Sequence, residues 1–200
     1  SDLRVIMSID RTLRENSYNP LILNTSHNKD LEIDNLESLN RLKVDGIILV
    51  ATEITSRHKE IINKLRVPVL IVGQECKEVK SIANDDYNAG ATIGEYVAKL
   101  GHKKILYFGV DEFDIAVGVK RKAGIIDKLK EHNVEEIRVE ITDFTTKTTE
   151  KIAYKVLQDY NPTMVICATD NIALGVLKAI HSLGKRIKED ISLSGDRKST

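Results

Sequence analysis

Short apolar runs alternate with helical patterns along the whole chain. The apolar runs fall at residues 21–23, 46–50, 69–72, 105–108, 138–141 and 164–167. Most of them are nearly continuous, as expected of strands that are buried on both faces of a sheet. Apolar residues at spacings of three and four predict helices at about residues 3–16, 31–42, 57–65, 88–100, 115–131, 146–159 and 171–183. Repeated units of this kind predict an α/β fold with parallel sheets and right-handed crossovers.

One local pattern occurs twice and suggests two lobes. Tyr18-Asn-Pro and Tyr160-Asn-Pro each place a proline where a helix ends and an apolar run begins. This repeat predicts two similar lobes, the first over residues 1–100 and the second over residues 101–200. The boundary is placed at Gly101, where a long predicted helix stops and a new strand begins.

Composition restricts the partners of the chain. Its 200 residues are 42% hydrophobic, which is enough for a buried core. Thirty basic and thirty acidic residues cancel, so no net charge draws these residues to nucleic acid or to an anionic membrane. No stretch approaches the roughly 20 apolar residues of a membrane-spanning helix. Cys76 and Cys167 lie in apolar surroundings without CxxC spacing, which predicts buried, unpaired thiols in a reducing cytosol.

The usual signatures of catalysis are missing from the sequence. It has no GxGxxG after a strand, no GxxxxGK[ST] and no GxSxG. The five histidines have no metal-ligand spacing, so we expect neither a metal nor a cofactor. No nucleophile with a base and no pair of carboxylates is visible, and we therefore do not expect an enzyme.

Polar side chains mark two junctions at which a helix begins. Thr169, Asp170 and Asn171 follow the apolar run 164–168. They can cap the helix, which is worth roughly 1 kcal/mol, or they can bind a ligand, because ligands of open α/β sheets lie at the carboxyl ends of strands. The segment that runs from Asp85 to Gly90 opens another helix, and capping is its simpler role.

Two further side chains have an open role. Arg121 lies between two lysines and is followed by Ala123-Gly124, small residues that indicate close packing on this side of the helix. Its planar guanidinium suits an ion pair, or a ligand with adjacent hydroxyls or a carboxylate. Consecutive helical residues point about 100° apart, so only one of the three basic residues can face a ligand. Phe144 lies in a predicted loop, where an aromatic ring must pack on the protein or on a ligand.

Six segments together resemble the effector-binding core of the lactose and galactose repressor family of bacterial transcription regulators. They occur in the order of the family: VDGIIL at 44–49, VPVLIV at 67–72, DDYNAG at 85–90 with LGH at 100–102, RKAG at 121–124, ATDNIALG at 168–175 and DISL at 190–193. The resemblance implies two periplasmic-binding-protein-like lobes with a ligand cleft between them. It also implies a cytoplasmic repressor domain that senses a sugar or sugar phosphate. The ligand-binding residues that it implies are Asp86, Asn88, Arg121, Phe144, Thr169 and Asp170.

The resemblance implies two macromolecular partners as well. Operator DNA would be bound by a head domain that precedes the core in the family, and a second copy of the chain would form a homodimer. Helix 171–183 is a candidate for the dimer contact, because Leu174 and Leu177 broaden its apolar face. A solute-binding protein of a transport system shares the architecture and stays the alternative. Where the family has an aromatic residue and a ligand-binding aspartate after Ser194-Gly195, this chain has Asp196-Arg197, so Asp196 is not assigned that role.

Overall fold

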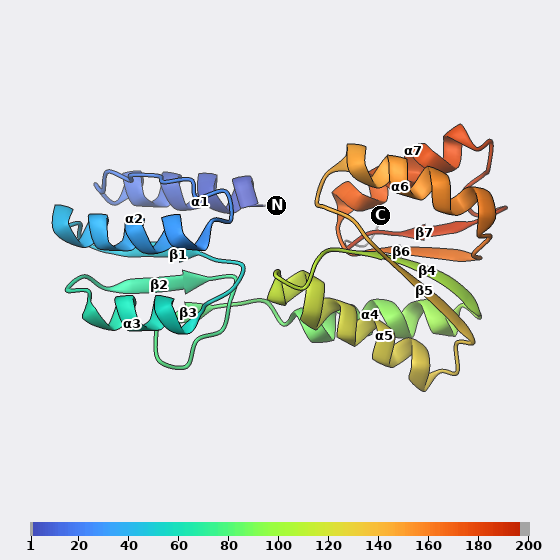
Figure 1. The fold of residues 1–200 in the computed structure, drawn as a ribbon, viewed down its shortest axis with the longest axis horizontal. Helices are drawn as coiled ribbons and strands as arrows, with labels where there is room; N and C mark the ends of the chain where they lie inside the picture. The colour runs from blue at the N-terminus through green and yellow to red at the C-terminus, as the bar shows by residue number, and fades with distance from the viewer. Residues whose placement is uncertain (1, 197–200) are drawn as a thin grey trace. The chain divides into compact units, whose positions relative to one another are not determined.

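The structure, a computed structural model, describes residues 2–196. It contains two separate sheets, as the prediction of two parallel-sheet lobes requires (Figure 1). The strands of the three-stranded sheet are β1 (Ile47–Val50), β2 (Val69–Val72) and β3 (Ser81–Ile82). The other sheet has the order β5-β4-β6-β7, and all its neighbours run parallel. No helix among the described residues is long and apolar enough to cross a membrane.

The chain divides into two compact units, of which the first holds residues up to 47 together with 56–68. This unit contains the helices α1 (Asp2–Glu15), α2 (Lys29–Leu42) and α3 (Ser56–Lys64). A buried pair joins α2 to α3, because His58 Nε2 lies 3.0 Å from Glu32 Oε2 and both side chains are almost fully covered. The exposed ion pair between Arg57 and Asp30, at 2.7 Å, links the same two helices.

The strand predicted at residues 21–23 is absent from the structure, and that prediction is wrong. The segment belongs to no strand, and the residues Leu21 and Ile22 are 60% and 59% exposed. A strand needs backbone partners as well as apolar side chains. No described strand pairs with this segment, so its apolar side chains remain in solvent.

The second unit, residues 48–55 and 69 onward, has the four-stranded sheet as its centre. Its strands are β4 (Lys104–Gly109), β5 (Glu136–Ile141), β6 (Met164–Cys167) and β7 (Ser192–Ser194). The helices α6 (Thr146–Asp159) and α7 (Asp170–Ser182) cover one face, and α4 (Asp86–Lys99) and α5 (Lys122–Glu131) cover the other (Figure 1). The continuous apolar runs predicted to be buried strands are therefore confirmed for β4 and β6, whose residues from Ile105 to Phe108 and from Val165 to Ile166 are fully buried.

Glycines let α4 lie close to the helix that carries Arg121. A methyl group on Gly124 would collide with the carbonyl oxygen of Tyr87, and one on Gly90 would collide with the carbonyl oxygen of Arg121. This contact groups α4 with the residues that follow it. The division of the lobes at residue 100 remains a prediction, whereas the packing of α4 favours a boundary before this helix.

The helix predicted at 115–131 is present, but its first part has an unexpected form. Residues Ile115–Arg121 form the π-helix η1, which continues directly into α5. Asp114 caps it, because its Oδ1 accepts a hydrogen bond of 2.9 Å from the amide of Val117. Helical segments of this rare type occur frequently at functional sites. Arg121 is the last residue of η1.

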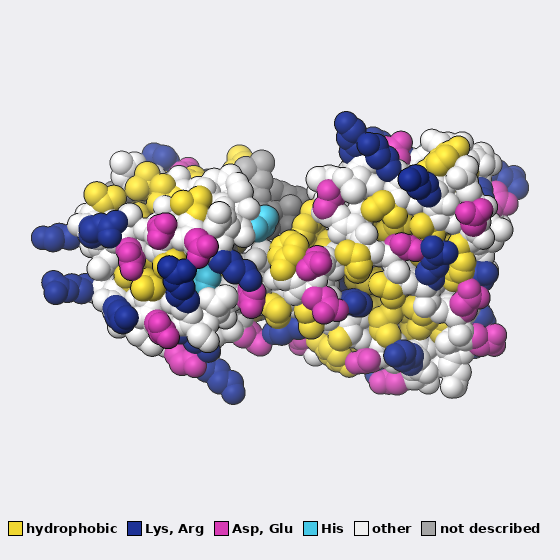
Figure 2. Space-filling model, viewed as in Figure 1, with side chains coloured by type: hydrophobic (Ala, Val, Ile, Leu, Met, Phe, Trp, Pro, Cys, Tyr) yellow, Lys and Arg dark blue, Asp and Glu magenta, His cyan; other side chains and the backbone are white. Residues whose placement is uncertain are grey.

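The surface and the cysteines agree with the composition. Basic and acidic side chains are intermingled on the face that Figure 2 shows, as expected for a chain with zero net charge. Cys76 and Cys167 are buried and free, which confirms the prediction for both thiols.

Candidate functional site

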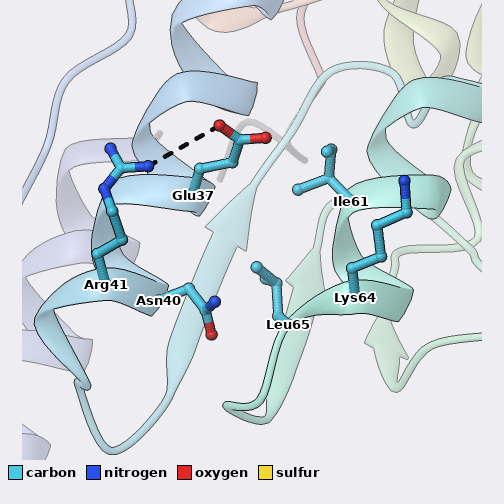
Figure 3. A pocket seen from close by; sticks show the side chains of 6 residues that line it. All are labelled: Glu37, Asn40, Arg41, Ile61, Lys64 and Leu65. Atoms are coloured by element: carbon cyan, nitrogen blue, oxygen red, sulfur yellow. Dashed lines mark ion pairs between the residues drawn. The ribbon is translucent and has the colours of Figure 1, made fainter.

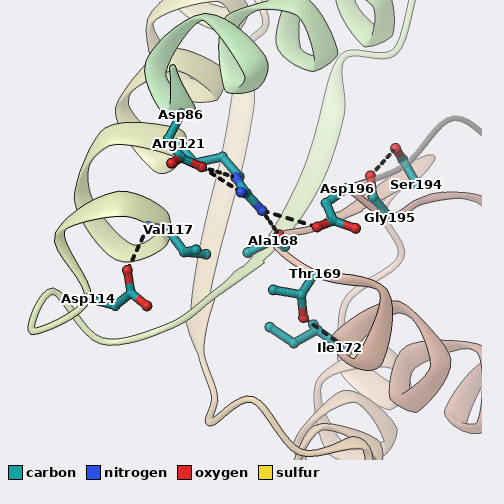
Figure 4. Close-up of polar contacts among 10 residues, drawn as sticks. All are labelled: Asp86, Asp114, Val117, Arg121, Ala168, Thr169, Ile172, Ser194, Gly195 and Asp196. Atoms are coloured by element: carbon teal, nitrogen blue, oxygen red, sulfur yellow. Dashed lines mark hydrogen bonds and ion pairs between the residues drawn. The ribbon is translucent and has the colours of Figure 1, made fainter. Parts of the chain in front are cut away.

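The guanidinium of Arg121 joins three segments of the second unit (Figure 4). Its Nε and Nη2 donate to Asp86 Oδ1 at 3.0 and 2.5 Å, and its Nη1 donates to the carbonyl oxygen of Ala168 at 2.7 Å. Nη1 also lies 3.4 Å from Asp196 Oδ2. The side chains of Arg121 and Asp86 are only 14% and 5% exposed. We call Asp86, Arg121, Ala168 and Asp196 the Arg121 cluster.

Helix packing brings Asp86 to Arg121. Asp86 is the first residue of α4, one turn before Gly90, and Gly90 packs directly on the backbone of Arg121. The helix starts at this point because Asp85 caps it, accepting a 3.1 Å hydrogen bond from the amide of Asn88. A carboxylate in the first turn is also favoured by the helix dipole. Capping and close packing therefore place one carboxylate against the guanidinium.

A further carboxylate, Asp114, lies near this pair. The pKa of Asp114 is raised, mainly because the carboxyl group is buried. The amide hydrogen bonds that it accepts as the cap of η1 lower its pKa, whereas the negative charge of Asp86 raises it. The guanidinium of Arg121 lowers the pKa of Asp114, and this is the smallest of these contributions. Among the described residues, acidic groups thus outnumber the guanidinium of Arg121 in this region.

The Arg121 cluster lies at the carboxyl ends of the central strands. Ala168 follows β6, and its amide donates to the carbonyl of Phe108 on β4 at 2.9 Å. Thr169 comes next and caps α7, accepting from the amide of Ile172 at 3.4 Å. Carboxyl ends of parallel strands are where α/β proteins bind ligands. The guanidinium of Arg121 is therefore fixed at the edge of the sheet that is best suited to a ligand.

The residues that directly follow β7 also reach this edge. A methyl group on Gly195 would lie 2.7 Å from Asp170 Oδ1, so the carboxylate of Asp170 packs against the backbone there. Asp196, the next residue, approaches Arg121 (Figure 4). Asp170 itself is exposed at the start of α7.

The structure separates the six residues expected to bind ligand into two groups. Asp86 and Arg121 are in direct contact, and Thr169 and Asp170 directly follow the carbonyl that Arg121 binds. The remaining two make other contacts. Asn88 Nδ2 donates to Asp85 Oδ2 at 2.6 Å, and Phe144 is half-buried and packs against the hydrophobic core.

The two lysines beside Arg121 point elsewhere. Lys120 pairs with Glu75 at 2.9 Å and Lys122 pairs with Glu112 at 3.1 Å. Only the middle one of the three basic residues reaches the strand ends, in agreement with the expected divergence of consecutive helical side chains.

Sequence reasoning did not assign two nearby carboxylates. Asp196 was left out because the sequence around it departs from the family pattern, although the structure places it 3.4 Å from Arg121. Asp114 precedes a predicted helix, which is the sequence signal of an N-cap. That signal identifies a cap, but it does not show that the carboxylate is buried.

Two surface hollows lie away from the Arg121 cluster. One, of about 230 Å³, lies in the first unit between α2 and α3, where Arg41 pairs with Glu37 at 4.0 Å (Figure 3). The other, of about 540 Å³, includes Pro162, Lys185 and Ile191, near the amino end of β6. That end is opposite to the one where ligands of parallel sheets bind. Among the residues that the structure describes, no group of three or more histidine, cysteine and acidic side chains could hold a metal ion.

A parallel sheet with charged and polar groups gathered at its carboxyl ends is the arrangement in which α/β proteins bind ligands. Comparison with known families makes this specific. Residues 3–197 match the family described as periplasmic binding proteins and sugar binding domain of LacI family. The chain belongs to this family, which confirms the resemblance and the fold class drawn from the sequence.

The similar proteins include several repressors. The chain is 43% identical over 163 residues to the sucrose operon repressor of Staphylococcus xylosus, a match that covers 81% of this chain and 51% of that protein. It is 26% identical over 206 residues to the arabinose metabolism transcriptional repressor of Geobacillus stearothermophilus, covering 96% of this chain and 56% of that protein. The chain thus spans about half the length of the curated relatives that it matches.

A solved structure shares the fold. It is a LacI family transcriptional regulator from Enterococcus faecium with bound ribose, with a TM-score of 0.80 and 22% identity. The match covers 94% of this chain and 69% of that one. At this identity the likeness concerns the fold alone.

Proposed function

We propose that the chain is the effector-binding part of a bacterial transcription repressor, and that its effector is a small neutral sugar held at the Arg121 cluster. The buried guanidinium at the carboxyl ends of β4 and β6 is the observation that carries this proposal. The family and the repressors among its relatives support it. In this proposal the sugar lies in a cleft between two lobes, and the second unit contributes the Arg121 cluster.

Local charge favours a neutral sugar over a sugar phosphate. Among the residues that the structure describes, Asp86 and Asp196 flank the guanidinium of Arg121, and Asp114 is near enough for the charges of Asp86 and Arg121 to shift its pKa. Two like charges 4 Å apart repel by about 4 kcal/mol at the effective dielectric constant of a protein surface, so a phosphate would meet net repulsion here. Sugar hydroxyls can accept hydrogen bonds from the guanidinium and donate to the carboxylates. The cluster therefore suits a hydroxyl-rich, uncharged ligand.

The lengths of the contacts suggest how a sugar would enter. Asp86 binds the guanidinium through two donors and fixes its orientation, whereas Asp196 approaches one donor only at 3.4 Å. A sugar hydroxyl would share Nη1 at the position of this longer contact. Thr169 and Asp170 would line the same edge, with Asn88 and Phe144 as further contacts.

We assign DNA binding to a part of the protein outside these residues. The chain has zero net charge, and it spans about half the length of the repressors that it resembles. Binding of operator DNA by these 200 residues should thus be weak. Tight, salt-sensitive DNA binding by this chain would contradict the assignment.

We further propose that the protein works in the cytoplasm as a homodimer. Leu174 on α7 is 47% exposed, which leaves an apolar side chain available for a contact with a second copy. A monomeric sedimentation profile at micromolar concentration would count against the dimer. Since the curated relatives named above are repressors, they favour regulation over a role in solute transport or in catalysis.

Calorimetric titration tests the proposed function. We expect at least one neutral sugar among sucrose, arabinose, ribose and trehalose to bind saturably at pH 7, with one site per chain. Glucose 6-phosphate should bind more weakly than the best neutral sugar. Binding of the phosphate alone would contradict the neutral effector, and no binding by any of the five would contradict the proposed function itself.

A further inference from the structure

Tyr107, on the central strand β4, has a buried hydroxyl group for which the described residues offer no hydrogen-bond partner. The residue is fully buried, and its Oη lacks a partner within bonding distance. A buried hydroxyl in this state lowers the stability of the folded protein, whereas a phenylalanine would fill the same space without that cost. Such a group therefore requires an explanation.

The ring of Tyr107 leans toward the carboxyl end of β4. A methyl group built on Gly109, two residues further along the strand, would lie 2.7 Å from Cε1 and 3.4 Å from Oη of Tyr107. The hydroxyl therefore lies close to the level of Gly109.

Along the strand direction, Gly109 and the Arg121 cluster lie at the same height in the sheet. Phe108 lies beside Cys167 in the sheet, so Gly109 lies next to Ala168, whose carbonyl accepts the hydrogen bond from Arg121. The charge of Arg121 is near enough to lower the pKa of Tyr107, although burial outweighs this effect and raises it. The hydroxyl thus lies under the same strand ends as the guanidinium.

We infer that Tyr107 is a further effector-binding residue, whose hydroxyl forms a hydrogen bond to a polar group of the bound sugar, directly or through one bridging water, at the floor of the Arg121 cluster. This inference rests on the proposed function. It explains why the residue is a tyrosine: the hydroxyl is unfavourable in the free protein and favourable in the complex. Contacts through one water are nearly as good enthalpically as direct ones. Because the hydroxyl is fully covered in the free protein, this contact requires that the groups covering it move when the sugar binds.

A purely structural role makes the opposite prediction. If the ring only fills the core, removing the hydroxyl leaves sugar affinity unchanged. Tyr160 provides the matched control, because it is a second buried tyrosine whose hydroxyl donates to the carbonyl of Ile105 at 3.4 Å. Tyr160→Phe removes a satisfied hydroxyl and should lower the melting temperature without changing affinity.

The experiment combines melting curves with calorimetric titration, using the sugar of the panel that wild type binds most tightly, with sucrose tested first. Tyr107→Phe should melt at the same or a higher temperature than wild type in the free state and should bind that sugar about five- to tenfold more weakly. Equal affinity of Tyr107→Phe and wild type overturns the inference. A lower melting temperature of the free variant also overturns it, because the hydroxyl would then have a partner without the sugar.

The same measurements separate this inference from the proposed function. If wild type binds sugar, Arg121→Ala loses binding and Tyr107→Phe does not, then only the role of Tyr107 is rejected. If wild type binds none of the four neutral sugars, the neutral effector is rejected and the role of Tyr107 is rejected with it. If wild type binds none of the five compounds, the proposed function fails as well.

Discussion

Replacing Asp86 by alanine should destabilise the free protein strongly. The variant leaves the guanidinium of Arg121, which is only 14% exposed, without the carboxylate that accepts two of its hydrogen bonds. Removing one partner of a buried ion pair costs about 3–5 kcal/mol. Since Arg121 retains some exposure and the carbonyl of Ala168, we expect about 3 kcal/mol. At about 2–4 °C per kcal/mol for a chain of this length, the melting temperature should fall by about 6–12 °C.

Urea and thermal unfolding followed by circular dichroism measure this loss. The matched control is Lys122→Ala, which breaks the ion pair between Lys122 and Glu112. The side chains of Lys122 and Glu112 are 27% and 70% exposed. Exposed pairs of this kind contribute at most about 1 kcal/mol. If Asp86→Ala lies within 1 kcal/mol of wild type, or if Lys122→Ala is equally damaging, then the buried pair does not hold α4 and η1 together as described.

Three other changes have outcomes set by the structure. Gly124→Ala should lower stability by about 1–3 kcal/mol, because the added methyl meets the backbone of Tyr87, whereas Gly46→Ala should be nearly neutral, with its methyl 3.6 Å from Pro68. Equal unfolding midpoints for these two variants would contradict the close approach of α4 and α5. Asp114→Asn should raise the melting temperature at pH 7, because the raised pKa of Asp114 means that its ionised form opposes folding. This gain should shrink as the pH falls toward the ordinary aspartate pKa of about 3.9, and a pH series of melting curves in which Asp114→Asn is less stable at pH 7 would refute it.

The pattern of apolar residues predicted the buried strands well, because a strand that is buried on both faces is apolar at nearly every position. The runs at 105–108 and 164–167 are apolar at nearly every position, and they became the fully buried β4 and β6. Residues 21–23 carry the same kind of run, yet form no strand. The difference is the backbone partner, which a local pattern cannot specify.

The candidate site was predicted in part for similar reasons. The small residues after Arg121 indicated close packing, and the structure shows this packing at Gly124. The pairing with Asp86 depends on the crossing of two helices and could not be seen from local spacing. The unpaired hydroxyl of Tyr107 could not be predicted either, because in the sequence Tyr107 is one aromatic residue within an apolar run.

The most direct measurement is calorimetric titration of the best-binding neutral sugar into wild type, Arg121→Ala and the two neighbouring variants Lys120→Ala and Lys122→Ala. All four are measured at a temperature at which circular dichroism shows them folded. A charge-assisted hydrogen bond from a desolvated guanidinium is worth about 1.5–3 kcal/mol, so Arg121→Ala should bind at least about tenfold more weakly. The two lysine variants should bind like wild type, because their side chains pair with Glu75 and Glu112 away from the strand ends. If Arg121→Ala binds the sugar as tightly as wild type, the Arg121 cluster is a structural ion pair and not the effector site.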